Sequence, residues 1–245
     1  MGRPEKPVDR TIPACAKLAE FLRRRKAIAE TTYQRMAEIL RKSGHTVSKA
    51  TLERAASGST VPTWETVRVF IVLTATTDEI LKMRFDDIMN HGKELWIRAR
   101  RATRAPYYVH KAPDPALISS KADLSRDLRH QHIWAGCPTP GEMERTSGSW
   151  ALPKSTTRRI IAGVTLPVDP QQAVAFLKAC YVEDPVDLEG WLDAAARVLP
   201  EIQWANAHQS MIGCVRACLT EDGDLEFLDS PVRVIRDVDF LGSAA

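Results

Sequence analysis

The chain has 245 residues, of which 44% are hydrophobic, so it can form two small domains with apolar cores. Its net charge of +3 hides an asymmetry: residues 1–111 carry 22 Lys and Arg against 12 Asp and Glu, and residues 112–245 carry 12 against 19. We therefore expect only the first half to be dominated by attraction to phosphates. No apolar run approaches the roughly 18 residues that span a bilayer, and the polar N-terminus lacks the apolar segment of a secretory signal.

Signatures of catalysis and metal binding are lacking in this sequence. It contains none of the motifs GxxxxGK[ST], GxGxxG and HExxH. His130 and His132 have no carboxylate or cysteine set at the spacing of a zinc site. The cysteines are odd in number, form no CxxC pair and fit reduced cytosolic thiols: Cys15, Cys137, Cys180, Cys214 and Cys218. We expect no enzymatic activity, no cofactor and no metal.

Residues 1–13 are predicted to form a basic arm. Their prolines disfavour a helix, and Arg3, Lys6 and Arg10 are cationic. Such an arm either lies along a groove of nucleic acid or is a disordered terminus.

Five segments between residues 14 and 105 show the periodicity of short helices. We expect them at 14–30, 33–42, 48–57, 64–74 and 78–104, the last one interrupted near Gly92. The first of them carries the run Arg23, Arg24, Arg25 and Lys26, which is either a solvated face or a clamp for phosphates.

The stretch from Ser48 to Trp64, SKATLERAASGSTVPTW, is the one around which this half is organised. Ser48 is a good N-cap, and Gly58 can end the helix with a positive φ. The remaining side chains separate into two faces, with Leu52, Ala55 and Ala56 inward and Lys49, Thr51 and Arg54 outward. A short helix of this kind, preceded by another, is what a helix-turn-helix places in the major groove of DNA.

Three motifs make residues 14–105 resemble the λ-repressor-like, Xre-type DNA-binding domain. They are the segments TYQRMAEIL, SKATLERAASG and TVPTWETVRVFI. The resemblance implies an all-α domain of five helices whose third helix reads DNA. The turn between Ala37 and Gly44 is about three residues longer than the compact family pattern.

The same arrangement is repeated after a Pro-rich linker at 106–120. Residues 154–167, KSTTRRIIAGVTLP, align without gaps on residues 49–62, KATLERAASGSTVP. Upstream, Thr139 and Met143 match Thr32 and Met36, and downstream Trp191 matches Trp96. The fold predicted from this repeat is two tandem five-helix helix-turn-helix domains, the second at 121–200.

The second domain has its own expected helices and two competing interpretations. The helices are predicted at 121–134, 140–147, 155–162, 170–181 and 185–198. Its recognition helix would present Lys154, Ser155, Thr156, Arg158 and Arg159. Because residues 112–200 carry 9 basic against 11 acidic residues, the domain is either a second DNA reader or a former reader kept for packing or dimerisation.

The C-terminal segment 201–245 is acidic, with 3 basic against 8 acidic residues. We predict a helix at 204–219 and a small β-hairpin formed by 225–228 and 232–235. The segment serves either self-association or packing on the second domain.

Together these features predict a cytoplasmic, nucleoid-associated protein that binds double-stranded DNA and regulates transcription. Arg54 is the candidate for guanine O6 and N7, because its two-pronged donor geometry matches that edge. Other residues predicted to touch DNA or its backbone in the first domain are Ser48, Lys49, Ala50, Thr51, Thr60, Arg23, Arg24, Arg25, Lys26, Arg98, Arg100 and Arg101.

Other partners and roles stay open beside this prediction. A homodimer, or a protein partner of the acidic C-terminal half, is the further interaction considered. The alternative functions are a protein-interaction module of antitoxin or scaffold type, and an architectural replication or telomere factor.

Overall fold

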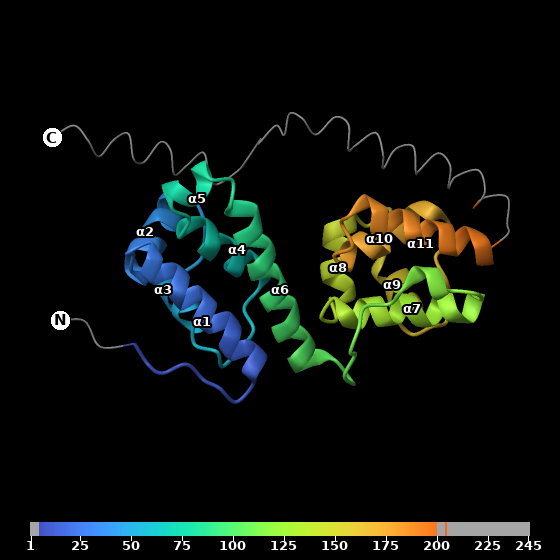
Figure 1. The fold of residues 1–245 in the computed structure, drawn as a ribbon, viewed down its shortest axis with the longest axis horizontal. Helices are drawn as coiled ribbons and strands as arrows, with labels where there is room; N and C mark the ends of the chain where they lie inside the picture. Colours follow the sequence, from blue (N-terminus) through green and yellow to red (C-terminus); the bar gives the residue numbers. More distant parts are fainter. Residues whose placement is uncertain (1–4, 200–203, 205–245) are drawn as a thin grey trace. The chain divides into compact units, whose positions relative to one another are not determined.

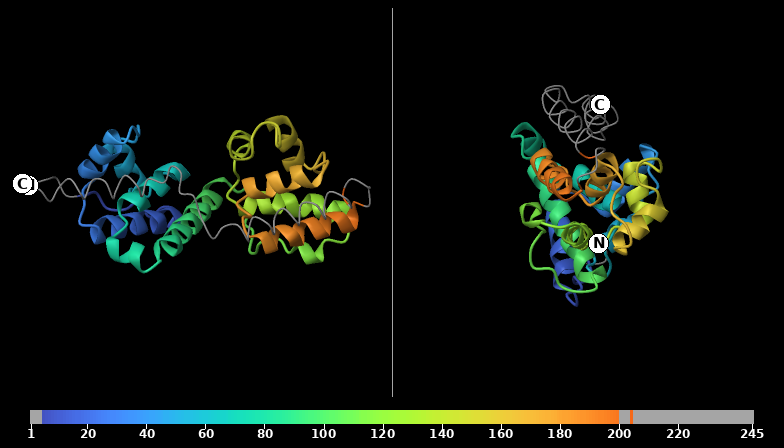
Figure 2. Two further views of the ribbon diagram at one scale, coloured as in Figure 1. Left: turned by 90° about the horizontal axis from the view of Figure 1, so that it is seen from above. Right: turned by 90° about the vertical axis from the view of Figure 1, so that its right-hand side faces the viewer.

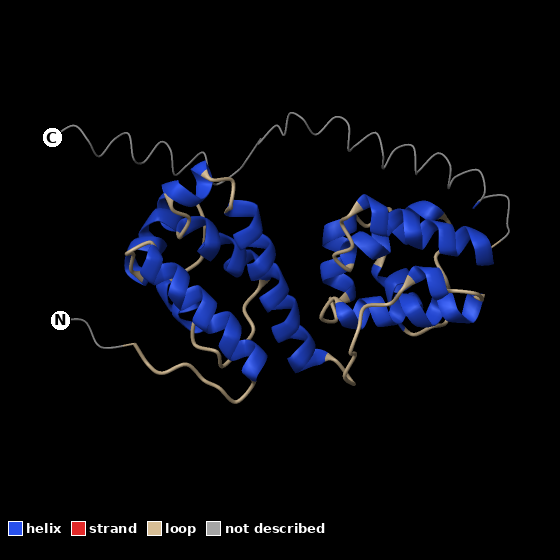
Figure 3. Ribbon diagram, in the orientation of Figure 1, coloured by secondary structure: helices blue, strands red, loops and turns tan. Residues whose placement is uncertain are grey.

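The computed structural model describes residues 5–199 and residue 204. This part of the chain consists of helices and loops without a strand, so its all-α character is confirmed (Figure 3). The chain divides between Thr103 and Arg104 into two compact parts, called unit 1 and unit 2 below (Figure 1). The helix and hairpin expected within residues 205–245 lie outside the described residues.

The described part of unit 1 contains six helices, which Figure 1 shows and Figure 2 shows from two further directions. They are α1 (Pro13–Ile28), α2 (Tyr33–Lys42), α3 (Lys49–Ala55), α4 (Trp64–Leu73), α5 (Thr77–Leu81) and α6 (Phe85–Arg104). Four of them begin at a hydroxyl side chain that accepts a hydrogen bond from a backbone N–H of the first turn: Thr32, Ser48, Thr63 and Thr76. The sequence therefore determines locally where these helices start.

The interruption expected near Gly92 is wrong. The helical pattern breaks earlier, at Met83, which has a φ of +56° between α5 and α6. Gly92 lies inside α6, where a Cβ atom would come within 2.4 Å of Ile71 Cδ1 and 3.2 Å of Phe21 Cε1. Its glycine allows α6 to approach α1 and α4 closely, which is a packing requirement and not a helix break.

The N-terminal arm lies against unit 1 from Glu5 onward. The backbone N–H of Asp9 donates to Ser57 O at 2.8 Å, just after α3. Gly58 has a φ of +82°, and a Cβ there would lie 2.6 Å from Asp9 O. The arm therefore packs on the end of α3 and depends on the glycine that ends this helix.

Within residues 104–199, unit 2 contains five α-helices and one short 3₁₀ turn. They are η1 (Pro115–Leu117), α7 (Lys121–Trp134), α8 (Pro140–Ser147), α9 (Lys154–Ile161), α10 (Pro170–Ala179) and α11 (Pro185–Val198). The end of the expected linker belongs to this unit: Ile118 is 1% exposed within its core, and the Arg197 guanidinium donates to Ile118 O at 2.9 Å. The end of this proline-rich segment is thus part of the domain, because its apolar residue Ile118 is buried in the core of unit 2.

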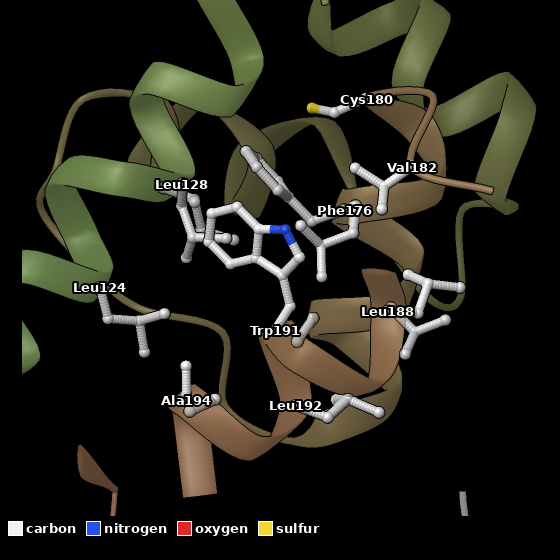
Figure 4. Packing of buried hydrophobic residues seen from close by; sticks show 14 of the residues in the cluster. Leu124, Leu128, Phe176, Cys180, Val182, Leu188, Trp191, Leu192 and Ala194 are labelled. Atoms are coloured by element: carbon white, nitrogen blue, oxygen red, sulfur yellow. The ribbon is translucent and has the colours of Figure 1, made fainter. Parts of the chain in front are cut away.

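Trp191 lies at the centre of the unit 2 core (Figure 4). Leu124 and Leu128 come from α7, Phe176 from α10 and Leu188 from α11, and all four are at most 2% exposed. Because each of these helices turns one apolar stripe inward, burial of this stripe is the main source of stability of the unit.

The same internal contacts recur in both units at a constant separation of 106 residues. Phe70 and Phe176, both 0% exposed, occupy equivalent turns of α4 and α10. The side chain of Arg25 in α1 donates to the carbonyl of Thr74, which ends α4. Its counterpart Gln131 in α7 donates to the carbonyl of Cys180, which ends α10, at 3.3 Å.

Helix α5 has no equivalent in unit 2. Trp96 and Trp191 are buried in α6 and α11 but are only 95 residues apart, so unit 1 holds eleven additional residues between the end of its fourth helix and this tryptophan. Helix α5 lies in this insertion and contributes no buried residue.

Candidate nucleic-acid interface

Helix α3 packs on α2 and α4 with its apolar face and leaves its polar face to solvent. Leu52 and Ala55 are 0% and 3% exposed. The opposite face bears exposed residues, namely Ser48, Lys49, Ala50, Glu53 and Arg54, with Thr51 half-buried beside them. The structure therefore places the residues of α3 that were predicted to contact DNA on one surface of this helix. Glu53, which was not predicted, lies on the same surface.

The N-terminus of α3 has a neutral cap. Ser48 Oγ accepts from the backbone N–H of Thr51 at 3.2 Å, and its hydroxyl is 3.0 Å from that of Thr51. The first turn of α3 contains no acidic residue. One turn later Lys49 and Glu53 approach within 3.8 Å, but both side chains are about half exposed, so this pair is weak.

Exposed cations and hydroxyls flank α3 on the neighbouring segments. Arg41 and Lys42 form the end of α2, Arg68 lies on α4, and Thr60 lies in the loop after α3. Basic and hydroxyl side chains of this kind, next to a helix that enters a groove, are groups that hold DNA phosphates.

The basic run in α1 is largely engaged within unit 1. Arg24 alone among its four residues is exposed. Arg23 Nε donates to Ala56 O at 2.8 Å, and Lys26 Nζ lies 2.9 Å from the Glu5 carboxylate. Arg25 is 4% exposed and faces inward. The expectation of a four-residue phosphate clamp is therefore corrected to one exposed arginine, because helical geometry turns the other three cations toward α3, the arm and the core.

Glu5 neutralises two cations of that run. Its carboxylate lies 3.2 Å from Arg23 Nε and accepts from the hydroxyl of Tyr33, in addition to its contact with Lys26. These hydrogen bonds and charges outweigh the effect of burial and lower the pKa of Glu5. The same carboxylate and the burial of the hydroxyl raise the pKa of Tyr33.

Arg25 makes a largely buried polar contact in unit 1. Its guanidinium forms an ion pair with Glu79 of α5, with Nη2 2.7 Å from Oε2, and also donates to Thr74 O. The side chains of Arg25 and Glu79 are 5% and 16% exposed. The hydrogen bond from Arg25 is the main cause that lowers the pKa of Glu79 to about 2.

The arginines expected to bind phosphate on α6 are divided between surface and interior. Arg98 is exposed and lies 3.2 Å from Glu94 one turn earlier. Arg100 is 2% exposed, with its guanidinium 4.6 Å from the centre of the Trp96 ring, and Arg101 is half-buried. Arg100 is thus a packing residue, and the prediction of a phosphate contact there is wrong.

Helix α9 of unit 2 places most of its predicted residues on the surface. Lys154, Ser155, Arg158 and Arg159 are exposed, and Thr156 is half-buried. Below them Thr157 and Ile160 are buried against the core. The surface of α9 therefore carries three cations, as α3 carries two.

The start of α9 differs from that of α3. Its N-cap is Pro153, which provides no side-chain hydrogen bond. In its place Glu144 of α8 accepts from the backbone N–H of Lys154 at 3.3 Å, and its other oxygen lies 3.0 Å from Lys154 Nζ. No sequence motif points to Glu144, because only the fold brings it to a helix that begins ten residues later.

A shallow cavity of about 360 Å³ lies beside α9. Its lining includes Arg158, Ile161, Cys137 and His132. His132 Nε2 is 2.8 Å from Pro138 O, and this contact fixes the ring at the edge of the cavity.

Two other classes of feature, metal sites and membrane spans, are absent from the described residues. Over residues 5–199 and 204, no set of three or more His, Cys, Asp or Glu side chains is placed to bind a metal ion. None of the helices in this part combines the length and apolarity needed to cross a bilayer.

Comparisons with protein-family models, with curated proteins and with solved structures gave no match.

Proposed function

We propose that unit 1 is a helix-turn-helix domain of λ-repressor-like, Xre type, and that the protein binds double-stranded DNA sequence-specifically as a transcriptional regulator. The observation that carries this proposal is the solvent face of α3. Lys49, Ala50 and Arg54 are exposed there, and the N-cap of the helix is the uncharged hydroxyl of Ser48. An α-helix with its side chains is about 10–12 Å in diameter, which fits a major groove of about 12 Å width.

Roles for the individual residues follow from their chemistry. The exposed guanidinium of Arg54 can donate two hydrogen bonds to guanine O6 and N7, and the carboxylate of Glu53 can accept from cytosine N4. Ser48, Lys49 and Thr60 would hold phosphates and set the register, with added sequence-independent attraction from exposed cations nearby.

The internal contacts shared by the two units support a duplicated domain. The hydrogen bond from α1 to the end of α4, and its counterpart from α7 to the end of α10, lie 106 residues apart. Equivalent burial of Phe70 and Phe176 extends this correspondence to the cores. We infer that unit 2 arose as a copy of unit 1, so that its surface can be compared with that of unit 1 position by position.

The experiment is selection of random duplex DNA by the full chain at about 0.15 M salt, followed by affinity measurements on the selected duplex. Arg54→Ala should cost about 1–3 kcal/mol and relax base preference at one position of the site. Arg98→Ala is the comparison variant, because Arg98 is an exposed arginine on α6 that was predicted to contact only phosphate, so its loss should weaken binding equally on all sequences. An equal loss on all sequences would make Arg54 a phosphate contact, and no loss would refute α3 as the reading helix.

A second candidate function concerns unit 2, which could bind protein. Trp150 and Val164 are 76% and 69% exposed, whereas the aligned positions in unit 1 are His45 and Ser59. Exposed apolar side chains in place of polar ones favour a homodimer or another protein partner. Sedimentation of the full chain, alone and with DNA, distinguishes this role from DNA binding by both units.

A further inference from the structure

Helices α3 and α9 differ in the group that meets their N-terminus. At α3 the group is the hydroxyl of Ser48, which is uncharged. At α9 it is the carboxylate of Glu144, which comes from the preceding helix α8. This comparison rests on the proposed function, in which α3 contacts DNA.

The Glu144 carboxylate bonds to two donors at once. One oxygen accepts from the backbone N–H of Lys154 at 3.3 Å, and the other lies 3.0 Å from the Lys154 ammonium. The Glu144 side chain is 22% exposed, so it is held against the helix and is not freely solvated. The hydrogen bond from Lys154, assisted by the charge of Arg145, lowers the pKa of Glu144, so the carboxylate is ionised at neutral pH.

The donors that Glu144 uses are the ones a DNA phosphate would need. Proteins hold phosphates with backbone N–H groups at helix N-termini and with the side chains of Lys and Arg. A phosphate that approached the start of α9 would therefore have to displace a carboxylate from both donors. It would also experience repulsion from this negative charge for as long as the carboxylate remained nearby.

We propose that Glu144 occupies the phosphate position of α9 from within the chain, and so excludes the start of this helix from DNA binding. The protein then reads DNA with unit 1, while α9 keeps its cations without using Lys154 as a phosphate contact. The acidic residue thus acts as a specificity determinant, because it shortens the DNA site from two segments to one.

The test measures the affinity of the full chain for its selected duplex at several salt concentrations. Glu144→Gln removes the charge but keeps the shape of the side chain, and frees the Lys154 ammonium. We expect three- to tenfold tighter binding at about 0.05 M salt and a slope of log K against log salt that is steeper by about one, as for one added phosphate contact. Asp187→Asn is the matched control, since it makes the same change in net charge on the exposed first turn of α11.

Two further variants assign the gain to Lys154. The double variant Glu144→Gln with Lys154→Ala should lose the gain, and Lys154→Ala in the wild-type background should leave affinity and salt slope unchanged. Binding by Glu144→Gln equal to that of Asp187→Asn would overturn the proposal, and so would a loss of affinity from Lys154→Ala alone. If wild-type binding did not depend on Arg54, the proposed function itself would fail, which is a distinct outcome.

Discussion

The ion pair of Arg25 and Glu79 allows the sharpest test of how unit 1 is held together. Glu79 stands on α5, a helix with no buried residue of its own, and its carboxylate also accepts from the backbone N–H of Thr76 at 3.0 Å. Glu79→Gln would leave the Arg25 guanidinium, which is 4% exposed, without a counter-charge. In addition, Arg25 Nε is buried without a hydrogen-bond partner among the described residues, so the guanidinium has little to compensate the loss.

Two estimates of the same interaction give the expected magnitude. Removing one partner of a buried ion pair costs about 3–5 kcal/mol in measured cases. A folded-state pKa of about 2 for Glu79, against an ordinary value of 4.5, corresponds to about 3 kcal/mol of stabilisation at neutral pH. We therefore expect Glu79→Gln to lower the free energy of unfolding of unit 1 by about 3 kcal/mol.

Unit 2 supplies the design of the compensating variant. The position equivalent to Arg25 is Gln131, an uncharged residue that donates to the corresponding helix-end carbonyl, that of Cys180. Arg25→Gln combined with Glu79→Gln copies this neutral arrangement into unit 1. The double variant should recover at least half of the stability that Glu79→Gln alone removes, because no buried charge is left unpaired.

Hydrogen exchange of the full chain in urea is the suitable assay, since it follows peptides of α1 and α4 separately from those of unit 2. The unit 2 peptides are the internal control and should be unaffected. The reasoning is refuted if Glu79→Gln costs less than about 1 kcal/mol, or if the double variant is no more stable than the single one.

Two further predictions concern acid and the end of α3. Because the pKa of Glu79 is lowered to about 2, its contribution is fully present above about pH 4.5 and is lost as the pH falls toward 2, so wild-type unit 1 should lose about 3 kcal/mol in this range. Acid titration of the same exchange signal should show this loss in the wild type and a clearly smaller loss in Glu79→Gln, in which Glu5, whose pKa is also lowered, still titrates. Gly58→Ala should destabilise unit 1 by about 2–3 kcal/mol, because the new Cβ meets Asp9 O at 2.6 Å in addition to the strain of a φ of +82°. Gly44→Ala is the control, with a φ of +77° and no atom within 4 Å, and should cost about 1 kcal/mol by thermal unfolding; equal costs would exclude the contact with Asp9 as a cause.

Local signals in the sequence determined the boundaries of several helices of this protein. The expected helices at 33–42, 121–134, 140–147 and 185–198 agree with α2, α7, α8 and α11. Ser48 could be recognised as a cap because a capping hydroxyl bonds within its own first turn. The apolar period similarly placed Leu52 and Ala55 in the core, and the aligned segments revealed the repeat.

The tertiary structure alone decided which charges remain on the surface. In the run Arg23 to Lys26, successive residues point about 100° apart around a helix, so one reaches the core while its neighbour stays in solvent. The partner of Arg25 lies 54 residues away on α5, and the interaction of Glu144 with Lys154 requires two helices to pack first. The sequence shows how many such charges the chain carries. Only the packing of the helices determines whether these charges neutralise one another or remain exposed for a partner.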